Sequence, residues 1–113
     1  MDDCLFCKII SGQIPTDFVY EDDKIVVFKD INPQAPVHLL FIPKEHIASA
    51  DDINQENSHL IAHIFELANR VAKDHGLDKG YRIVNNCKEE GGQSVDHIHF
   101  HLMGGRQMLW PAG

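Results

Sequence analysis

The amino-acid sequence predicts one α+β domain over residues 1–113, with a five-stranded antiparallel sheet, one short N-terminal helix and one long helix. Five short segments rich in apolar residues are bounded by turn residues, as strands are. One longer segment instead repeats apolar residues at helical spacing. A tight turn joins two of the strand segments, which favours antiparallel pairing. The length of 113 residues fits a single domain with its own core.

The N-terminal half is predicted to contain the short helix and three strands. Asp2 or Asp3 is expected to cap the helix at its start, and Gly12 is expected to end it. The dipeptide Asp22-Asp23 indicates a hairpin turn between two strands. The predicted bounds are residues 4–10 for the helix, 18–21, 24–29 and 37–42 for the strands, and 30–36 for a proline-containing loop.

The C-terminal half is predicted to contain the long helix, of about 20 residues, and two more strands. Asp52 with Gln55 resembles a capping box at its start, and Gly76 suits the position just after its end. The strands are expected at residues 81–86 and 95–103, with a polar loop at 87–94 between them. The helical repeat consists of Leu60, Ile61, Ile64, Phe65, Leu67, Ala68, Val71 and Ala72.

Composition and charge narrow the classes of function. The net charge of −7 disfavours a nucleic-acid partner, because such proteins neutralise phosphates with Lys and Arg. No apolar run approaches the length of a membrane span, and the first residues are acidic where a signal peptide needs positive charge. We therefore expect a cytoplasmic protein without a membrane partner. Two of the three cysteines form a Cys-x-x-Cys pair, which in a reducing compartment suggests metal binding or redox chemistry.

The most informative segment is His97-Ile98-His99-Phe100-His101-Leu102-Met103. Side chains alternate along a strand, so the three histidines would face one side and the apolar residues between them the core. With eight histidines in 113 residues, chance gives about 0.04 occurrences of H-x-H-x-H. Three adjacent imidazoles must be hydrogen-bonded, bound to metal or chemically active. The alternative is a solvated polar face that happens to be rich in histidine.

A second informative segment, Gly91-Gly92-Gln93-Ser94, lies directly upstream of the histidines. Glycines let backbone N–H groups approach an anion, and Gln and Ser add side-chain donors. The alternative is an ordinary flexible turn. An anion cradle beside an imidazole nucleophile indicates phosphoryl or nucleotidyl transfer.

These segments resemble those of the histidine-triad (HIT) family, whose motif His-φ-His-φ-His-φ-φ, with φ apolar, is matched at every position. The resemblance covers nearly the whole chain and is strongest to the Hint branch, the purine nucleoside phosphoramidases. It is weaker to the fragile-histidine and galactose-phosphate transferase branches. Other matching segments are Phe6-x-Lys8-Ile9-Ile10, Gly12-x-Ile14-Pro15, Glu21-Asp22-Asp23, Asp30-Ile31-x-Pro33-Gln34-Ala35-Pro36-x-His38, Ile42-Pro43-Lys44-x-His46-Ile47 and Gly104-Gly105-Arg106-Gln107-Met108-x-Trp110-Pro111.

The resemblance implies a role for each matching residue around the phosphate. His99 would attack the α-phosphorus of an adenosine 5′-phosphoramidate, and water would then release the nucleoside monophosphate from the nucleotidyl-histidine. His101 would bind the phosphate oxygens, and His38 would support the triad from a neighbouring strand. Gln93 and Ser94 would contact the phosphate or its leaving group. Asn86 also matches a phosphate-side position.

The resemblance also implies a purine nucleoside site. Asp30 matches the residue that holds the ribose hydroxyls. The alternative is that this aspartate, which follows a strand, simply forms a turn. Four apolar residues match the slot for the base, although most such residues simply belong to a core. They are Phe6, Ile9, Phe28 and Ile31.

The spacing Cys4-x-x-Cys7 is half of a zinc site. Some bacterial relatives that resemble this sequence bind zinc, and their other ligands match His46 and His97. A closed Cys₂His₂ set would be structural, so the chemistry itself would need no cofactor. The alternative is that both cysteines are small apolar residues of the first helix.

Three rival functions remain open from the sequence. Two or three of the triad histidines could bind one catalytic metal ion. The substrate could be a diadenosine polyphosphate, or the pocket could serve a non-catalytic nucleotide-binding signalling module. For assembly, the tail around Trp110 resembles a segment that crosses a homodimer in the family; its alternative is a tail folded onto its own subunit.

His59, His63, His75 and Cys87 match no functional position.

Overall fold

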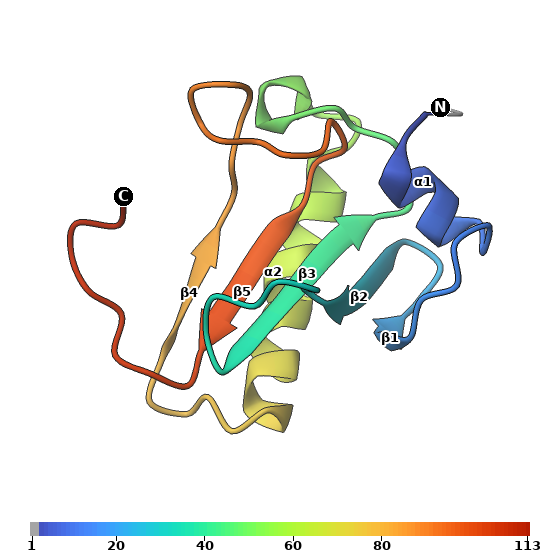
Figure 1. Cartoon of the computed structure of the whole chain (residues 1–113). Coiled ribbons are helices and arrows are strands. Elements are labelled where there is room, and N and C mark those ends of the chain that lie inside the picture. The colour runs from blue at the N-terminus through green and yellow to red at the C-terminus, as the bar shows by residue number, and fades with distance from the viewer. Residues whose placement is uncertain (1–2) are drawn as a thin grey trace.

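A computed structural model describes residues 3–113 and confirms the predicted α+β class. Its five strands form one antiparallel sheet in the order β1-β2-β3-β5-β4, so that β1 and β4 are the edges (Figure 1). The elements are α1 (Leu5–Ile10), β1 (Phe18–Glu21), β2 (Ile25–Lys29), β3 (Val37–Pro43), the 3₁₀ helix η1 (Ala50–Asp52), α2 (Ser58–Asp74), β4 (Tyr81–Val84) and β5 (Phe100–Gly104).

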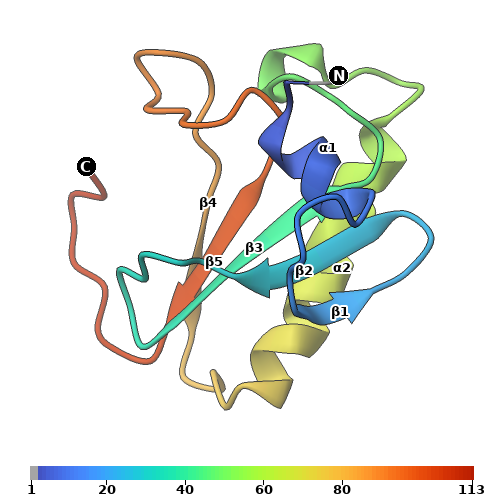
Figure 2. The same cartoon turned by 45° about the vertical axis from the view of Figure 1, so that its right-hand side comes forward.

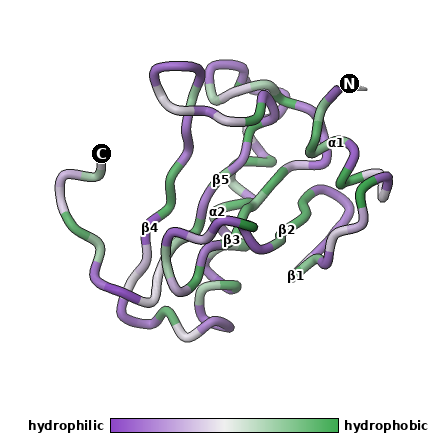
Figure 3. Tube along the Cα trace, viewed as in Figure 1, coloured by the Kyte–Doolittle hydropathy of each residue, from purple (hydrophilic) through white to green (hydrophobic). Residues whose placement is uncertain are grey.

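The two helices cover opposite faces of the sheet, as the turned view in Figure 2 shows. Alternation along β2 sends Ile25 and Val27 into a core under α2, whereas Val26 and Phe28 pack with residues of α1. β2 and β3 are therefore buried along most of their length, whereas the edge strand β1 alternates between half-buried and exposed residues. The hydropathy colouring shows the apolar run of β2 in green (Figure 3). The short α1 has 6 residues and packs Phe6 and Ile9 against its face of the sheet.

The starts of both helices differ from the predicted ones. Asp2 lies outside the described residues, and the N-cap of α1 is Cys4, whose Sγ accepts the Cys7 backbone N–H at 3.3 Å. The predicted capping box of Asp52 with Gln55 is wrong, because Asp52 pairs with Ser49 in a capping box at the start of η1.

α2 accordingly begins at Ser58, well after the predicted cap. Asn54 and Asn57 bond to each other's backbone and hold the intervening segment in turns, which side chains of this type favour over helix. The predicted end is confirmed. Gly76 has a φ of +73° and closes a Schellman motif, with the Leu77 N–H donating to the Ala72 carbonyl at 3.0 Å.

The last strand is shorter than predicted. β5 begins at Phe100, so residues 95–99 precede it without strand pairing. Within this lead-in, the Ile98 N–H donates to the Ile47 carbonyl at 2.7 Å. The lead-in therefore follows residues 44–48, which come after β3, rather than the sheet itself. Among residues 3–113, no helix combines the length and apolar character needed to cross a membrane.

Candidate active site and metal centre

The predicted alternation of the three histidines is present although only His101 lies in a strand. Ile98 and Phe100 are buried in the core under α2, whereas the histidines face the side that carries α1. His97 is fully buried, and His99 is 3% exposed. Each imidazole then meets a different set of partners, so one short segment supplies two distinct sites.

His99 presents one free ring nitrogen. Its Nδ1 lies 2.8 Å from the His97 carbonyl oxygen, which can only accept, so Nδ1 carries the proton and Nε2 a lone pair. The Phe6 ring packs edge-on against the imidazole, with centroids 5.0 Å apart. Burial lowers the pKa of His99, although the bond to His97 and the charge of Asp30 oppose the shift. A neutral imidazole with an unprotonated Nε2 is a competent nucleophile.

His101, in contrast to His99, presents a protonated ring nitrogen. The Gln34 backbone N–H donates to His38 Nδ1 at 3.0 Å, so the proton of a neutral His38 is on Nε2. That Nε2–H donates to His101 Nδ1 at 2.9 Å, which leaves His101 with its own proton on Nε2. Burial and the neighbouring His99 and His38 rings lower the pKa of His101 to about 4, although Asp30 opposes them. The chain of bonds therefore ends in a neutral N–H donor.

Asp30 completes this cluster. Its Oδ2 lies 3.4 Å from His38 Nε2 and 3.9 Å from His101 Nδ1, while its Oδ1 accepts the Asn32 N–H at 2.8 Å. Asp30, His38 and His101 could bring three ligand atoms together around a metal ion. The tautomer of His38 argues against that use, because its Nε2 carries a proton and offers no lone pair.

The loop before the histidines is held in shape by side-chain amides. The Gln93 Oε1 accepts the Lys88 N–H at 2.7 Å, and its Nε2 donates to the carbonyls of Ala48 and Val95 at 2.7 and 2.9 Å. Gln93 thus ties the loop to the segment after β3. The contact of Gln93 with the phosphate or its leaving group, which the family resemblance implies, stays a prediction.

The rest of the loop is equally constrained. Asn86 Nδ2 donates to the Gly91 carbonyl at 2.7 Å. A Cβ at Gly91 would lie 2.2 Å from the Cys87 carbonyl, so only glycine fits there. Gly92 has a φ of +78°. Ser94 is exposed and has no side-chain hydrogen bond within residues 3–113, so its hydroxyl is available to a ligand.

The predicted base slot is divided between buried and exposed residues. Phe6, Ile9 and Phe28 belong to one buried cluster, with the Phe6 and Phe28 rings 6.0 Å apart. Ile31, in contrast, is fully exposed in the loop before β3. Phe6 therefore brings this apolar cluster into contact with the His97 and His99 rings.

Four predicted metal ligands come together around His97. The Sγ atoms of Cys4 and Cys7 lie 3.3 and 3.6 Å from His97 Nδ1, and Cys7 Sγ lies 3.4 Å from His46 Nδ1. All four ligand atoms fall within 4.8 Å of one another. A zinc tetrahedron with bonds of about 2.3 Å to sulfur and 2.0 Å to nitrogen has S···N edges of about 3.5 Å. The observed separations therefore fit a zinc ion.

The tautomer of His97 also fits a metal. Its Nε2 lies 2.8 Å from the Pro43 carbonyl and so carries the proton, which leaves the Nδ1 lone pair facing the two thiols. Burial lowers the pKa of His97 to about 4, although its bond to Pro43 opposes the shift. Burial and the adjacent Cys4 raise the pKa of the Cys7 thiol, so a thiolate there needs a cation as its partner.

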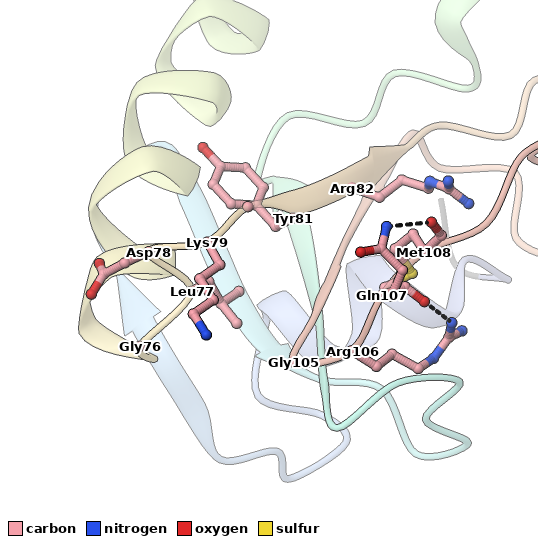
Figure 4. Close-up of a pocket in the computed structure, with 11 residues that line it drawn as sticks. Gly76, Leu77, Asp78, Lys79, Tyr81, Arg82, Gly105, Arg106, Gln107 and Met108 are labelled. Carbon is pink, nitrogen blue, oxygen red and sulfur yellow. Dashed lines mark hydrogen bonds between the residues drawn. The ribbon is translucent and has the colours of Figure 1, made fainter.

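A cavity of about 740 Å³ lies elsewhere, between the start of β4 and the C-terminal tail (Figure 4). Its lining contains none of the predicted site residues. Arg82 donates to the Leu109 carbonyl, and Arg106 donates to the carbonyls of Gln107 and Gln34. These cations hold the tail and the loop before β3 in place, and they do not converge on a common point (Figure 4).

The fold and the two histidine clusters define a histidine-triad protein, and the chain belongs to the histidine-triad family. A family model described as "Scavenger mRNA decapping enzyme C-term binding" matches residues 3–110. The chain is 50% identical over 113 residues to a "14 kDa zinc-binding protein" of Brassica juncea, covering 98% of this chain and 100% of that protein.

Solved structures agree with this assignment. A HIT family hydrolase from Legionella pneumophila superposes with a TM-score of 0.95 at 54% identity, over 98% of this chain and 100% of that chain. A histidine triad nucleotide-binding protein from Candida albicans gives a TM-score of 0.81 at 35% identity, over 98% and 85% of the two chains. The similarity to the Legionella protein supports a hydrolase class for this chain.

Proposed function

We propose that the protein hydrolyses purine nucleoside 5′-phosphoramidates, attacking the α-phosphorus with His99 Nε2. The observation that carries the proposal is the pair of opposite tautomers. His99 offers a lone pair, and His101, whose ring centroid is 5.2 Å away, offers an N–H. A nucleophile beside a neutral donor suits a phosphate that is attacked at phosphorus while charge develops on its oxygens. The similarity to a HIT family hydrolase supports the same class.

In the first step, His99 Nε2 forms a bond to phosphorus and the bond from phosphorus to the amine nitrogen breaks. The amine leaves after taking a proton from solvent, with the Ser94 hydroxyl as its hydrogen-bond partner. The Nδ1–H of His99 remains on the His97 carbonyl, which stabilises the imidazolium of the nucleotidyl-histidine. His101 Nε2–H donates to a phosphate oxygen throughout.

In the second step, water attacks the phosphorus, gives up a proton to solvent, and the bond to His99 breaks, which releases the nucleoside monophosphate and restores the free ring. Covalent catalysis of this kind divides one difficult displacement into two easier ones. No metal ion takes part in either step. Since His99 and His101 are both neutral, the phosphate is held by N–H and O–H donors rather than by cationic side chains.

For the nucleoside, we propose that Phe6, Ile9, Phe28 and Ile31 contact the base, and that Asp30 accepts bonds from the ribose hydroxyls. Asn86 and Gln93 shape the phosphate loop from behind. The buried aromatic pair of Phe6 and Phe28 supports the first assignment. Similarity to a histidine triad nucleotide-binding protein supports a nucleotide ligand.

We further propose a structural zinc ion held by Cys4, Cys7, His46 and His97. The donor separations and the tautomer of His97 support it, as does similarity to a protein named for zinc binding. When bound, zinc supplies charge that keeps the thiols deprotonated and joins α1 to the segments after β3 and before β5. The site is closed by four protein ligands, so it leaves no position for substrate.

We also propose that the protein is a cytoplasmic homodimer. The edge strand β4 and the exposed tail support a second copy, since Leu109 is 72% and Trp110 85% exposed. Two-fold dimers are the commonest oligomers, and an edge strand pairs readily with its own copy. Light scattering at micromolar concentration should give twice the mass of one chain; a single-chain mass would contradict the dimer.

The decisive experiment for the enzymatic proposal is turnover of adenosine 5′-phosphoramidate by the wild type and by His99→Asn, with metal analysis of both proteins. Adenosine monophosphate binding, measured by calorimetry, serves as the control for an intact pocket. Turnover by the wild type and its loss in the variant are expected, with binding retained. Equal turnover by the two proteins would contradict the assigned nucleophile, and binding without any turnover would favour a signalling module.

A further inference from the structure

Asn85 has no role in the steps above, yet its side chain contacts the backbone of the proposed nucleophile. It follows directly after β4 and is half-buried. Its Nδ2 donates to the His99 carbonyl oxygen at 2.9 Å. The two residues are 14 positions apart in the sequence, so the bond joins two separate segments.

The bond between Asn85 and His99 lies just beyond the end of the sheet. The last pair between β4 and β5 is Val84 with His101, and the last pair between β3 and β5 is Phe41 with Phe100. His99 is therefore the first residue outside the sheet, with neither neighbouring strand paired to it. A backbone carbonyl in a buried position needs a donor. Among residues 3–113, the Asn85 amide is the donor that this carbonyl has.

The next residue, Asn86, makes a similar contact with the loop that precedes the histidines. Asn86 Nδ2 donates to the Gly91 carbonyl, in the loop that ends at Ser94. Two consecutive amides thus hold the two parts that a phosphate would meet: Asn85 holds the segment of His99, and Asn86 holds the loop. Because both side chains hang from one short stretch of backbone, the spacing of nucleophile and loop is fixed through that stretch.

We propose that Asn85 is a positioning residue that sets the place of His99 relative to the phosphate loop. This inference rests on the function proposed above. The His99 ring is already oriented by the His97 carbonyl and the Phe6 ring, so the remaining freedom is that of its backbone. Attack requires the nitrogen within about 3–3.5 Å of the phosphorus and in line, and a 1 Å misplacement can cost about 100-fold in rate.

The test replaces the amide with groups of similar size that cannot donate. Asn85→Leu is expected to lower kcat for adenosine 5′-phosphoramidate about 10- to 100-fold while KM and adenosine monophosphate affinity change less than about 3-fold. Asn85→Ala, which introduces no new group, serves if the leucine variant does not fold. Asn69→Leu, on the exposed face of α2, is the matched control and should leave kcat unchanged.

A second measurement does not depend on turnover. In wild type, ¹⁵N chemical shifts of the His99 ring should report Nδ1 protonated and Nε2 free. In Asn85→Leu the two tautomers should mix, since a displaced backbone weakens the bond to the His97 carbonyl. A lower melting temperature with kcat and the ring shifts unchanged would overturn the proposal and leave Asn85 a purely structural residue. Absence of turnover by the wild type would instead contradict the proposed function, and the ring shifts would still decide the role of Asn85.

Discussion

His97 and His99 are two residues apart, buried to the same degree, and suited to different chemistry. In each ring, one nitrogen donates to a backbone carbonyl at 2.8 Å. For His97 this is Nε2, which leaves Nδ1 for the thiols of Cys4 and Cys7. For His99 it is Nδ1, which leaves Nε2 for the pocket. The comparison teaches that the carbonyl each ring meets, rather than the residue type, decides whether a triad histidine suits a metal or a substrate.

The largest expected effect is at the ring with the free Nε2. His99→Asn should lower kcat by several orders of magnitude, because the variant lacks the nucleophile. The variant should bind adenosine monophosphate about as tightly as wild type. Trapping with acid after a short reaction should detect a phosphorus-linked histidine in wild type alone. Near-wild-type turnover by His99→Asn would contradict the contrast between His97 and His99, since both rings would then be structural.

A smaller loss of rate is expected at His101. His101→Ala removes the neutral N–H donor but keeps the nucleophile, so kcat should fall about 100-fold, the usual scale for one donor to a developing charge. Steady-state kinetics with adenosine 5′-phosphoramidate measure it. If kcat is unchanged and KM alone rises, His101 contributes to binding equally in the ground state and the transition state.

The sequence predicts much of this arrangement because its strongest patterns are local. The alternation of His97, His99 and His101 with apolar residues, and the turn glycine at Gly76, are each set by neighbours in the chain. The spacing of Cys4 and Cys7 indicates half of a metal site, but the other two donors, His46 and His97, were predicted only through family resemblance. Nothing in the spacing of Cys4 and Cys7 says that His46 and His97 lie nearby.

What the sequence could not give is the hydrogen bonding that selects each tautomer. The groups involved are the backbone N–H of Gln34 and the backbone carbonyls of Pro43 and His97, and such groups do not distinguish one residue type from another, apart from the N–H that proline lacks. Asn85 was missed for a related reason, since a polar residue after a strand is ordinary. Its partner, the His99 carbonyl, becomes unpaired only because β5 begins at Phe100 rather than at the predicted Val95. Such features depend on tertiary register, and no local pattern encodes them.

At the metal cluster we expect a change in stability rather than rate. Cys7→Ser, or chelation of the wild type, should lower the melting temperature by at least about 5 °C, because bound metal stabilises only the folded state. Turnover at moderate temperature should fall less. Cys87→Ser is the control, since that thiol lies outside the cluster. Absence of zinc from protein purified without added metal, together with an unchanged melting temperature in Cys4→Ser and Cys7→Ser, would remove the site and return His97 to the pocket.

The smallest effect is expected at a third histidine, on the far side of the sheet, where a carboxylate rather than a carbonyl is the partner. His63 Nε2 lies 2.7 Å from Asp22 Oδ2, which also accepts the Tyr20 hydroxyl. Burial alone would raise the pKa of Asp22, but the bonds from His63, two backbone amides and Tyr20 outweigh it and hold the pKa well below its usual range.

A carboxyl with a lowered pKa stabilises the folded state above its unfolded pKa of about 3.9 and loses that contribution as the pH falls through the lower folded value. Asp22→Asn should therefore cost about 1–2 kcal/mol at pH 7, and the gap between wild type and variant should narrow progressively below about pH 4. Urea unfolding at pH 7, 4 and 2.5 measures it, with the exposed neighbour Asp23→Asn as the control. A gap that stays constant with pH would mean that the bonds at Asp22 do not favour its ionised form.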